Sequence, residues 1–156
     1  MSGIAAIATD RSMTSARFDL AIAEACRIAQ VPFEEFVSTV MAGGYPRLPG
    51  VAPGSPRRFD ETDLLALYIY GRLLAFGFGG LRAGEYACRA HAGLRAEPRA
   101  QSISIALTSD GGKRVVIEQD LQRPAAAMLP ERIHFDIAAI RRQLQQPADR
   151  SAAEPA

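Results

Sequence analysis

The sequence predicts an α+β protein in which four N-terminal helices precede a small antiparallel three-strand β unit and a short C-terminal helix. Three observations support this fold class. Apolar residues recur at helical spacing between Phe18 and Leu94, and they alternate with polar residues beyond Ala100. Prolines and glycines crowd the stretch between Tyr45 and Arg58. With 156 residues and 48% hydrophobic content, the chain can build a core without covalent staples.

Two short helices separated by a tight turn begin the predicted fold. The first covers residues 19–29, with Asp19 as its N-cap. The second begins at Pro32, because a proline at the first helical position loses no hydrogen bond, and it ends before Gly43. Two helices joined in this way form a helix-turn-helix unit. The buried stripe of the second helix is expected to be Phe33, Phe36, Val37 and Val40.

An irregular loop leads from this unit to two further helices. Four prolines between residues 45 and 58 exclude a helix there and predict a loop or wing. The third helix begins at Asp60, where Asp63 completes a capping-box pattern. The fourth covers residues 81–96. The expected buried residues are Leu64, Leu67, Tyr68, Gly71 and Leu74 in the third helix and Ala83, Ala87, Ala90 and Leu94 in the fourth.

The remaining chain is expected to form strands. Alternation from Ser102 to Thr108 predicts one strand, and the Asp110-Gly111-Gly112 turn returns the chain into a second. A third strand is predicted over residues 132–137, followed by a helix over 138–145 that covers part of the sheet.

The predicted organisation has four parts. Residues 1–15 and 147–156 are expected to be disordered tails. Residues 16–99 form the helical domain, and residues 100–146 form a unit for dimerisation or for binding a small-molecule or protein effector. We expect no secretory leader, because residues 1–8 lack a basic start and a long apolar run. The longest apolar stretch is broken by Arg72 and by glycines, so we expect a cytoplasmic protein without a membrane partner.

The most informative motif lies at the end of the proline-rich loop. Arg57 and Arg58 precede Phe59, and Asp60 then starts a helix. Arginine side chains can bind phosphate through two parallel hydrogen bonds, and Phe59 could anchor the loop in the core. The alternative reading is an ordinary surface loop followed by a capped helix.

This motif and the order of elements resemble the MerR-like winged helix-turn-helix domain over residues 18–94. The best-matching positions are Ala25, Ala29, Gln30, Val31, Gly43, Pro46, Arg58, Phe59, Asp63, Leu64, Gly77 and Phe78. The resemblance implies a transcriptional regulator that binds double-stranded DNA, with the second helix in the major groove and Arg58 on phosphate. A homodimer is also implied, although the long C-terminal dimerisation helix of that family is absent from the prediction, so a dimer would be built differently.

The resemblance leads to a set of expected DNA-binding residues. They are Arg47, Arg57, Arg58, Phe59, Ser38, Thr39 and Arg82, with Ser38 and Thr39 as base-edge readers. Between residues 46 and 99, eight arginines stand against five acidic residues, which permits a nucleic-acid partner without requiring one. Glu34 and Glu35 depart from the family pattern, because carboxylates facing a duplex meet phosphate repulsion unless one accepts from a cytosine amino group. The alternative function is therefore a winged-helix protein-interaction module without DNA binding.

Other kinds of site have weaker support. Cys88 and His91 share one predicted helix face, but a zinc site needs further ligands, and we expect a buried thiol beside a partly exposed imidazole. Neither glycine cluster has the spacing of a phosphate-binding loop. His134 is not accompanied by an ordered acid–base set. We therefore expect no enzymatic activity, no cofactor and no metal.

Overall fold

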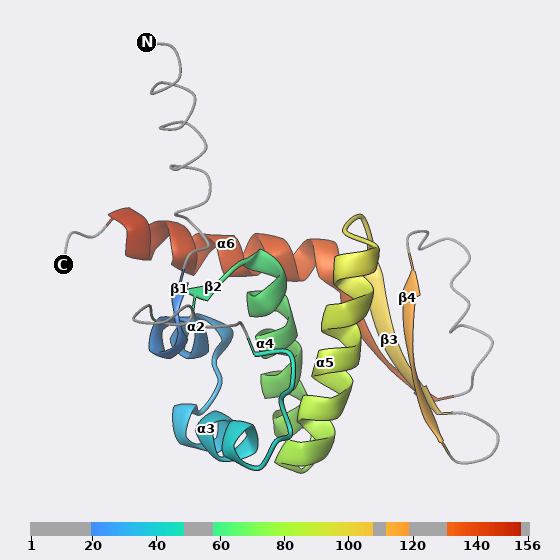
Figure 1. The fold of residues 1–156 in the computed structure, drawn as a ribbon. Helices are drawn as coiled ribbons and strands as arrows, with labels where there is room; N and C mark the ends of the chain where they lie inside the picture. The colour runs from blue at the N-terminus through green and yellow to red at the C-terminus, as the bar shows by residue number, and fades with distance from the viewer. Residues whose placement is uncertain (1–19, 49–57, 108–111, 119–130, 154–156) are drawn as a thin grey trace, which may run out of the picture.

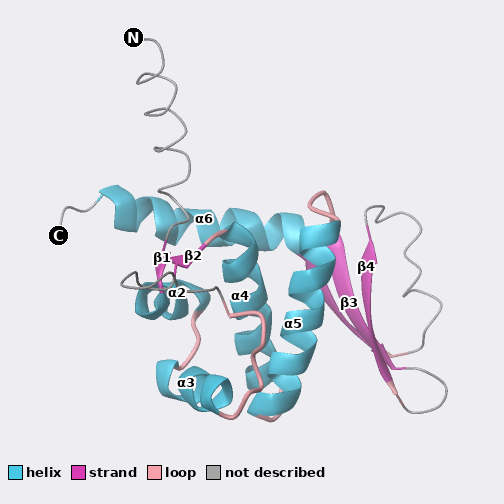
Figure 2. Ribbon diagram, in the orientation of Figure 1, coloured by secondary structure: helices cyan, strands magenta, loops and turns pink. Residues whose placement is uncertain are grey.

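The computed structural model describes residues 20–48, 58–107, 112–118 and 131–153. These residues form an α+β fold with five helices, as predicted at the level of class (Figures 1 and 2). The helices are α2 (Ile22–Ala29), α3 (Phe33–Met41), α4 (Glu61–Ala75), α5 (Gly80–Ala96) and α6 (Ile137–Ala153). The strands are β1 (Leu20–Ala21), β2 (Arg58–Phe59), β3 (Ser102–Leu107), β4 (Lys113–Glu118) and β5 (Arg132–Asp136).

The first helix is shorter than predicted because the residues before it form a strand. Leu20 pairs with Phe59 and Ala21 with Arg58 in an antiparallel two-stranded sheet, so α2 begins only at Ile22. Gln30 ends α2 in the left-handed conformation, with φ of 57°. Pro32 is the N-cap of α3, so the helix begins at Phe33, one position later than predicted. The predicted cap Asp19 lies outside the described residues.

Helix α4 begins with the predicted capping box and lies at the centre of the helical layer. The backbone N–H of Asp63 donates to Asp60 Oδ1, and the N–H of Asp60 donates to Asp63 Oδ2, each at 2.9 Å. α2, α5, α6 and β2 all pack against this helix. Burial therefore extends beyond the predicted stripe to Leu65, Ala66, Ile69, Tyr70 and Leu73.

The second sheet has the predicted antiparallel hairpin and third strand. β3 is its central strand, and Ile103 stands opposite Ile117 of β4 and Phe135 of β5. Asp110 and Gly111 of the predicted turn lie outside the described residues. β4 packs against α5, where a Cβ atom at Gly93 would lie 2.5 Å from Ile117 Cγ1. Glycine at this position therefore permits the close approach of helix and strand.

Helix α6 is longer than the predicted helix over residues 138–145. It starts directly after β5, where Asp136 Oδ1 accepts from the N–H of Ala139 at 3.0 Å, and it crosses back over α2 and α4 (Figure 1). Residues 147–153 are therefore helical, which corrects the expectation of a tail from residue 147. The local sequence favours an end there, because residues 147–153 are mostly small and polar and begin with Pro147, which has no N–H to donate to the helix. The structure nevertheless continues α6 through this proline to Ala153.

One hydrophobic core runs through the helices and the larger sheet. It includes Leu64 of α4, Leu94 of α5, Ile103 of β3 and Leu144 of α6. The boundary proposed between residues 99 and 100 thus falls inside a continuous core. Within the described residues, no helix is both long and apolar enough to cross a membrane.

Candidate functional site

A buried polar contact fixes the rotation of α3 about its own axis. The Thr39 hydroxyl lies 2.8 Å from the Tyr70 hydroxyl and 3.1 Å from the backbone oxygen of Glu35. Phe36, on the same side, is fully buried, and its ring meets those of Tyr45 and Tyr70 edge to face at 4.9 and 5.6 Å between centroids. Thr39 thus faces the interior, which corrects its assignment as a base-edge reader.

The opposite face of α3 is exposed and carries no positive charge. The helix sequence contains two acidic residues and no basic one. Its exposed residues are Phe33, Glu34, Glu35, Ser38 and Met41. The side chains of Phe33 and Met41 are 45% and 83% exposed. Phe33 was expected in the buried stripe, but it is exposed, although α2 and α5 pack against α3. Ser38 is exposed, as a surface role requires.

A groove separates α3 from the turn between α4 and α5. Its volume is about 630 Å³. The lining residues are Glu34, Glu35, Ser38, Thr39, Tyr70, Leu74 and Gly77 to Gly80, and none of them is basic. A Cβ atom at Gly80 would lie 2.5 Å from Thr39 Oγ1. Glycine therefore lets α5 begin close to α3 and closes one end of the groove.

The wing residues lie at another part of the fold. Phe59 is fully buried, as an anchoring role requires, and Arg58 is exposed beside it. Arg57 lies outside the described residues. β2 packs against α2 and α4, and α2 lies between the β1–β2 sheet and α3 in Figure 1. The outer face of α3 and Arg58 therefore do not form one continuous positive surface within the described residues.

The other two predicted arginines lie near α5. Arg47 lines a second cavity, of about 480 Å³, together with Leu81, Cys88 and Arg89 of that helix. The Arg89 guanidinium is 2.6 Å from a carboxylate oxygen of Glu85. Arg82 is exposed near the start of α5. The structure thus brings Arg47 close to α5.

Asp63 and His91 form a buried pair between α4 and α5. His91 Nε2 lies 2.7 Å from Asp63 Oδ1, and the Arg95 guanidinium donates to the same oxygen at 3.2 Å. Burial alone would raise the pKa of Asp63, but hydrogen bonds from His91 and from the N–H of Asp60 hold that pKa below its ordinary value. His91 is buried, which corrects the expectation of a partly exposed imidazole.

The two thiols have the properties of packing groups. Burial raises the pKa of Cys26 to about 11 and also raises that of Cys88, so both remain protonated near neutral pH. Among the described residues, no three potential ligands from histidine, cysteine, aspartate and glutamate come close enough to hold a metal ion.

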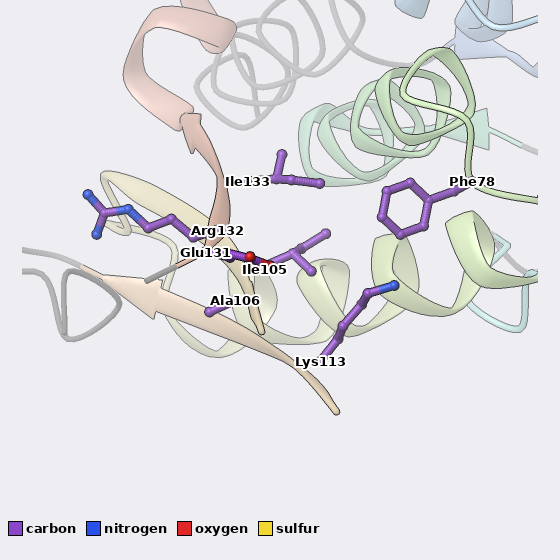
Figure 3. A pocket seen from close by; sticks show the side chains of 7 residues that line it. All are labelled: Phe78, Ile105, Ala106, Lys113, Glu131, Arg132 and Ile133. Carbon is purple, nitrogen blue, oxygen red and sulfur yellow. The ribbon is translucent and has the colours of Figure 1, made fainter. Parts of the chain in front are cut away.

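The C-terminal unit, in which effector binding was expected, borders a smaller cavity. Phe78 and Ile133 point into the same space, whereas Arg132 points away from it (Figure 3). The Lys113 ammonium lies 4.8 Å from the centroid of the Phe78 ring. The cavity volume is about 220 Å³, below the range of roughly 300–1,000 Å³ common for drug-sized ligands. The groove beside α3 is therefore the stronger candidate site.

Sequence reasoning missed the exposure of Met41 and the buried contact between Tyr70 and Thr39. Positions 34, 38 and 41 follow helical spacing and so share one face, which could have indicated the exposure of Met41. The contact of Tyr70 with Thr39 joins residues far apart in the chain and leaves no local signal. No protein-family model matches the chain, and no curated protein matches it in sequence.

Proposed function

We propose that this chain is a protein-interaction module on a winged helix-turn-helix scaffold, and that the outer face of α3 binds a partner protein. One observation carries the proposal: the face that would enter a major groove displays Glu34 and Glu35 and has no basic residue. A carboxylate pair on this face would repel the phosphates of a duplex. The exposed Phe33 and Met41 side chains instead suit a protein surface, where aromatic residues and methionine are enriched.

The scaffold assignment has support from the order and pairing of elements. α2 and α3 are joined by a tight turn, and β2 precedes α4 at the end of the proline-rich segment. The pairing of β2 with β1 and the burial of Phe59 attach the end of that segment to the domain. This arrangement is compatible with a wing between α3 and α4.

Photo-crosslinking in cells that make the natural protein tests the interaction. A photoreactive amino acid would replace Met41, and a matched control would replace the exposed Arg142 of α6. We expect discrete adducts from position 41 that resist nuclease and disappear in the Glu34→Lys and Glu35→Lys double variant. Adducts that vanish with nuclease, or equal adducts from position 142, would contradict protein binding at α3.

A second candidate function is a MerR-like transcriptional regulator that binds double-stranded DNA as a homodimer. The exposure of Arg58 next to the buried Phe59 favours it, since a phosphate-binding wing would need this arrangement. Arg47, Arg82 and Ser38 are also exposed. Titration with a random-sequence duplex at low salt separates the two candidates. A DNA-binding protein should bind this duplex, and its affinity should fall as the salt concentration rises.

A further inference from the structure

We infer that the groove between α3 and the α4–α5 turn binds a segment of the partner protein that carries both arginine or lysine and apolar side chains. The inference rests on the proposed function and adds the chemistry of the bound segment. It follows from the apolar residues that line the groove, from the charge of the groove and from its size.

Apolar side chains line part of the groove. Leu74 of α4 and Phe78 of the α4–α5 turn are partly buried and line it together with Tyr70. The exposed Phe33 and Met41 belong to α3, the helix that carries Glu34 and Glu35. A groove lined by apolar side chains and a few polar groups suits a segment that also carries apolar groups.

The charge of the groove indicates a basic segment. The carboxylates of Glu34 and Glu35 line it, and no arginine, lysine or histidine does. Among the residues that the structure describes, neither carboxylate forms an ion pair with a cation. A guanidinium group can donate two parallel hydrogen bonds to one carboxylate, so arginine suits this groove particularly well. Negative charge on the protein therefore complements positive charge on the segment.

The size and the floor of the groove suit a peptide. The volume of about 630 Å³ lies within the range of roughly 300–1,000 Å³ that holds drug-sized ligands. The Thr39 and Tyr70 hydroxyls at its floor are already engaged with each other, at 2.8 Å. These two hydroxyls are therefore fixed by the fold, while the carboxylates of Glu34 and Glu35 and the apolar side chains of Leu74 and Phe78 line the same groove. A segment that presents basic and apolar side chains on one face would meet both features.

The test uses the full chain and a short fluorescein-labelled peptide of arginine and leucine in helical spacing. We expect binding in fluorescence anisotropy that weakens with salt, and much weaker binding of the same peptide with glutamate in place of arginine. The Glu34→Gln and Glu35→Gln double variant should lose about tenfold in affinity, or about 1.4 kcal/mol. The matched control Glu85→Gln removes an exposed carboxylate that lies outside the groove and should bind as the wild type does.

Two outcomes would overturn the inference. One is equal binding of the two peptides, and the other is an equal loss in Glu85→Gln and in the double variant, which would indicate general charge attraction. A result in which position 41 still crosslinks to a protein while the glutamine variants have no effect would reject the basic segment alone. If the glutamine variants have no effect and position 41 also gives no protein adducts, the proposed function itself is rejected.

Discussion

The hydroxyls of Thr39 and Tyr70 lie 2.8 Å apart inside the protein, and this contact determines which face of α3 points outward. It joins α3 to α4 across 31 positions of sequence. Because Thr39 is held inside, Glu34, Glu35 and Ser38 are presented to solvent. The surface chemistry of α3 thus follows from a buried polar pair.

Thr39→Val should lower the free energy of unfolding by about 1–2 kcal/mol, because it leaves the buried Tyr70 hydroxyl without this partner. Urea denaturation measures the change. Ser38→Val, at the exposed neighbouring position, should change stability by less than about 0.5 kcal/mol. Equal stability of Thr39→Val and the wild type would mean that Thr39 is not held as described.

Gly84→Ala should destabilise the protein by about 1–3 kcal/mol through overpacking. A Cβ atom at Gly84 would overlap the carbonyl oxygen of Gly44, so α5 would have to move from the loop after α3. Gly79→Ala is the matched control, because its Cβ atom would meet nothing within 4 Å. Thermal or urea unfolding of both variants gives the comparison, and similar stabilities would contradict the packing of this loop on α5.

Asp63 should make stability depend on pH in the acid range. Its pKa is lowered in the folded protein, so the folded state binds fewer protons than the unfolded chain as pH falls below the ordinary value of 3.8. The stabilisation is present above that value and is lost as pH falls through the folded pKa. Urea unfolding of Asp63→Asn should therefore show a smaller loss between neutral and strongly acidic pH than the wild type shows. A loss of equal size in the two proteins would remove Asp63 from this role.

Arg58→Ala tests the second candidate function. If Arg58 binds phosphate, the variant should weaken duplex binding at every sequence and reduce the slope of log affinity against log salt by about one unit. Titrations of a random duplex at several salt concentrations measure the slope, with Arg142→Ala as the control. A slope that does not change would exclude a phosphate contact by Arg58.

Several local features could be predicted from the sequence because their signals are local. The capping box of Asp60 and Asp63 and the β3–β4 hairpin depend on residues near one another in the chain. The orientation of α3 was harder, since its apolar residues surround much of the helix, and Phe33 was assigned to the wrong face. The strand β1 is only two residues long and exists through its pairing with β2.

Only part of the candidate site could be predicted, because some of its residues come together only in the folded protein. Glu34 and Glu35 were recognised as unusual on a DNA-facing helix, and this prediction led to the alternative function. The groove itself could not be foreseen, because the α4–α5 turn reaches α3 only in the folded protein, with Gly80 against Thr39.

The most direct measurement is a side-by-side titration of the wild-type chain with the arginine–leucine peptide and with a short random-sequence duplex, both at the same low salt concentration. The account predicts that the peptide binds and that the duplex does not, because the carboxylates of α3 attract the first and repel the second. The account would be contradicted if the chain bound the duplex more tightly than the peptide and if the Glu34→Gln and Glu35→Gln double variant still bound the duplex.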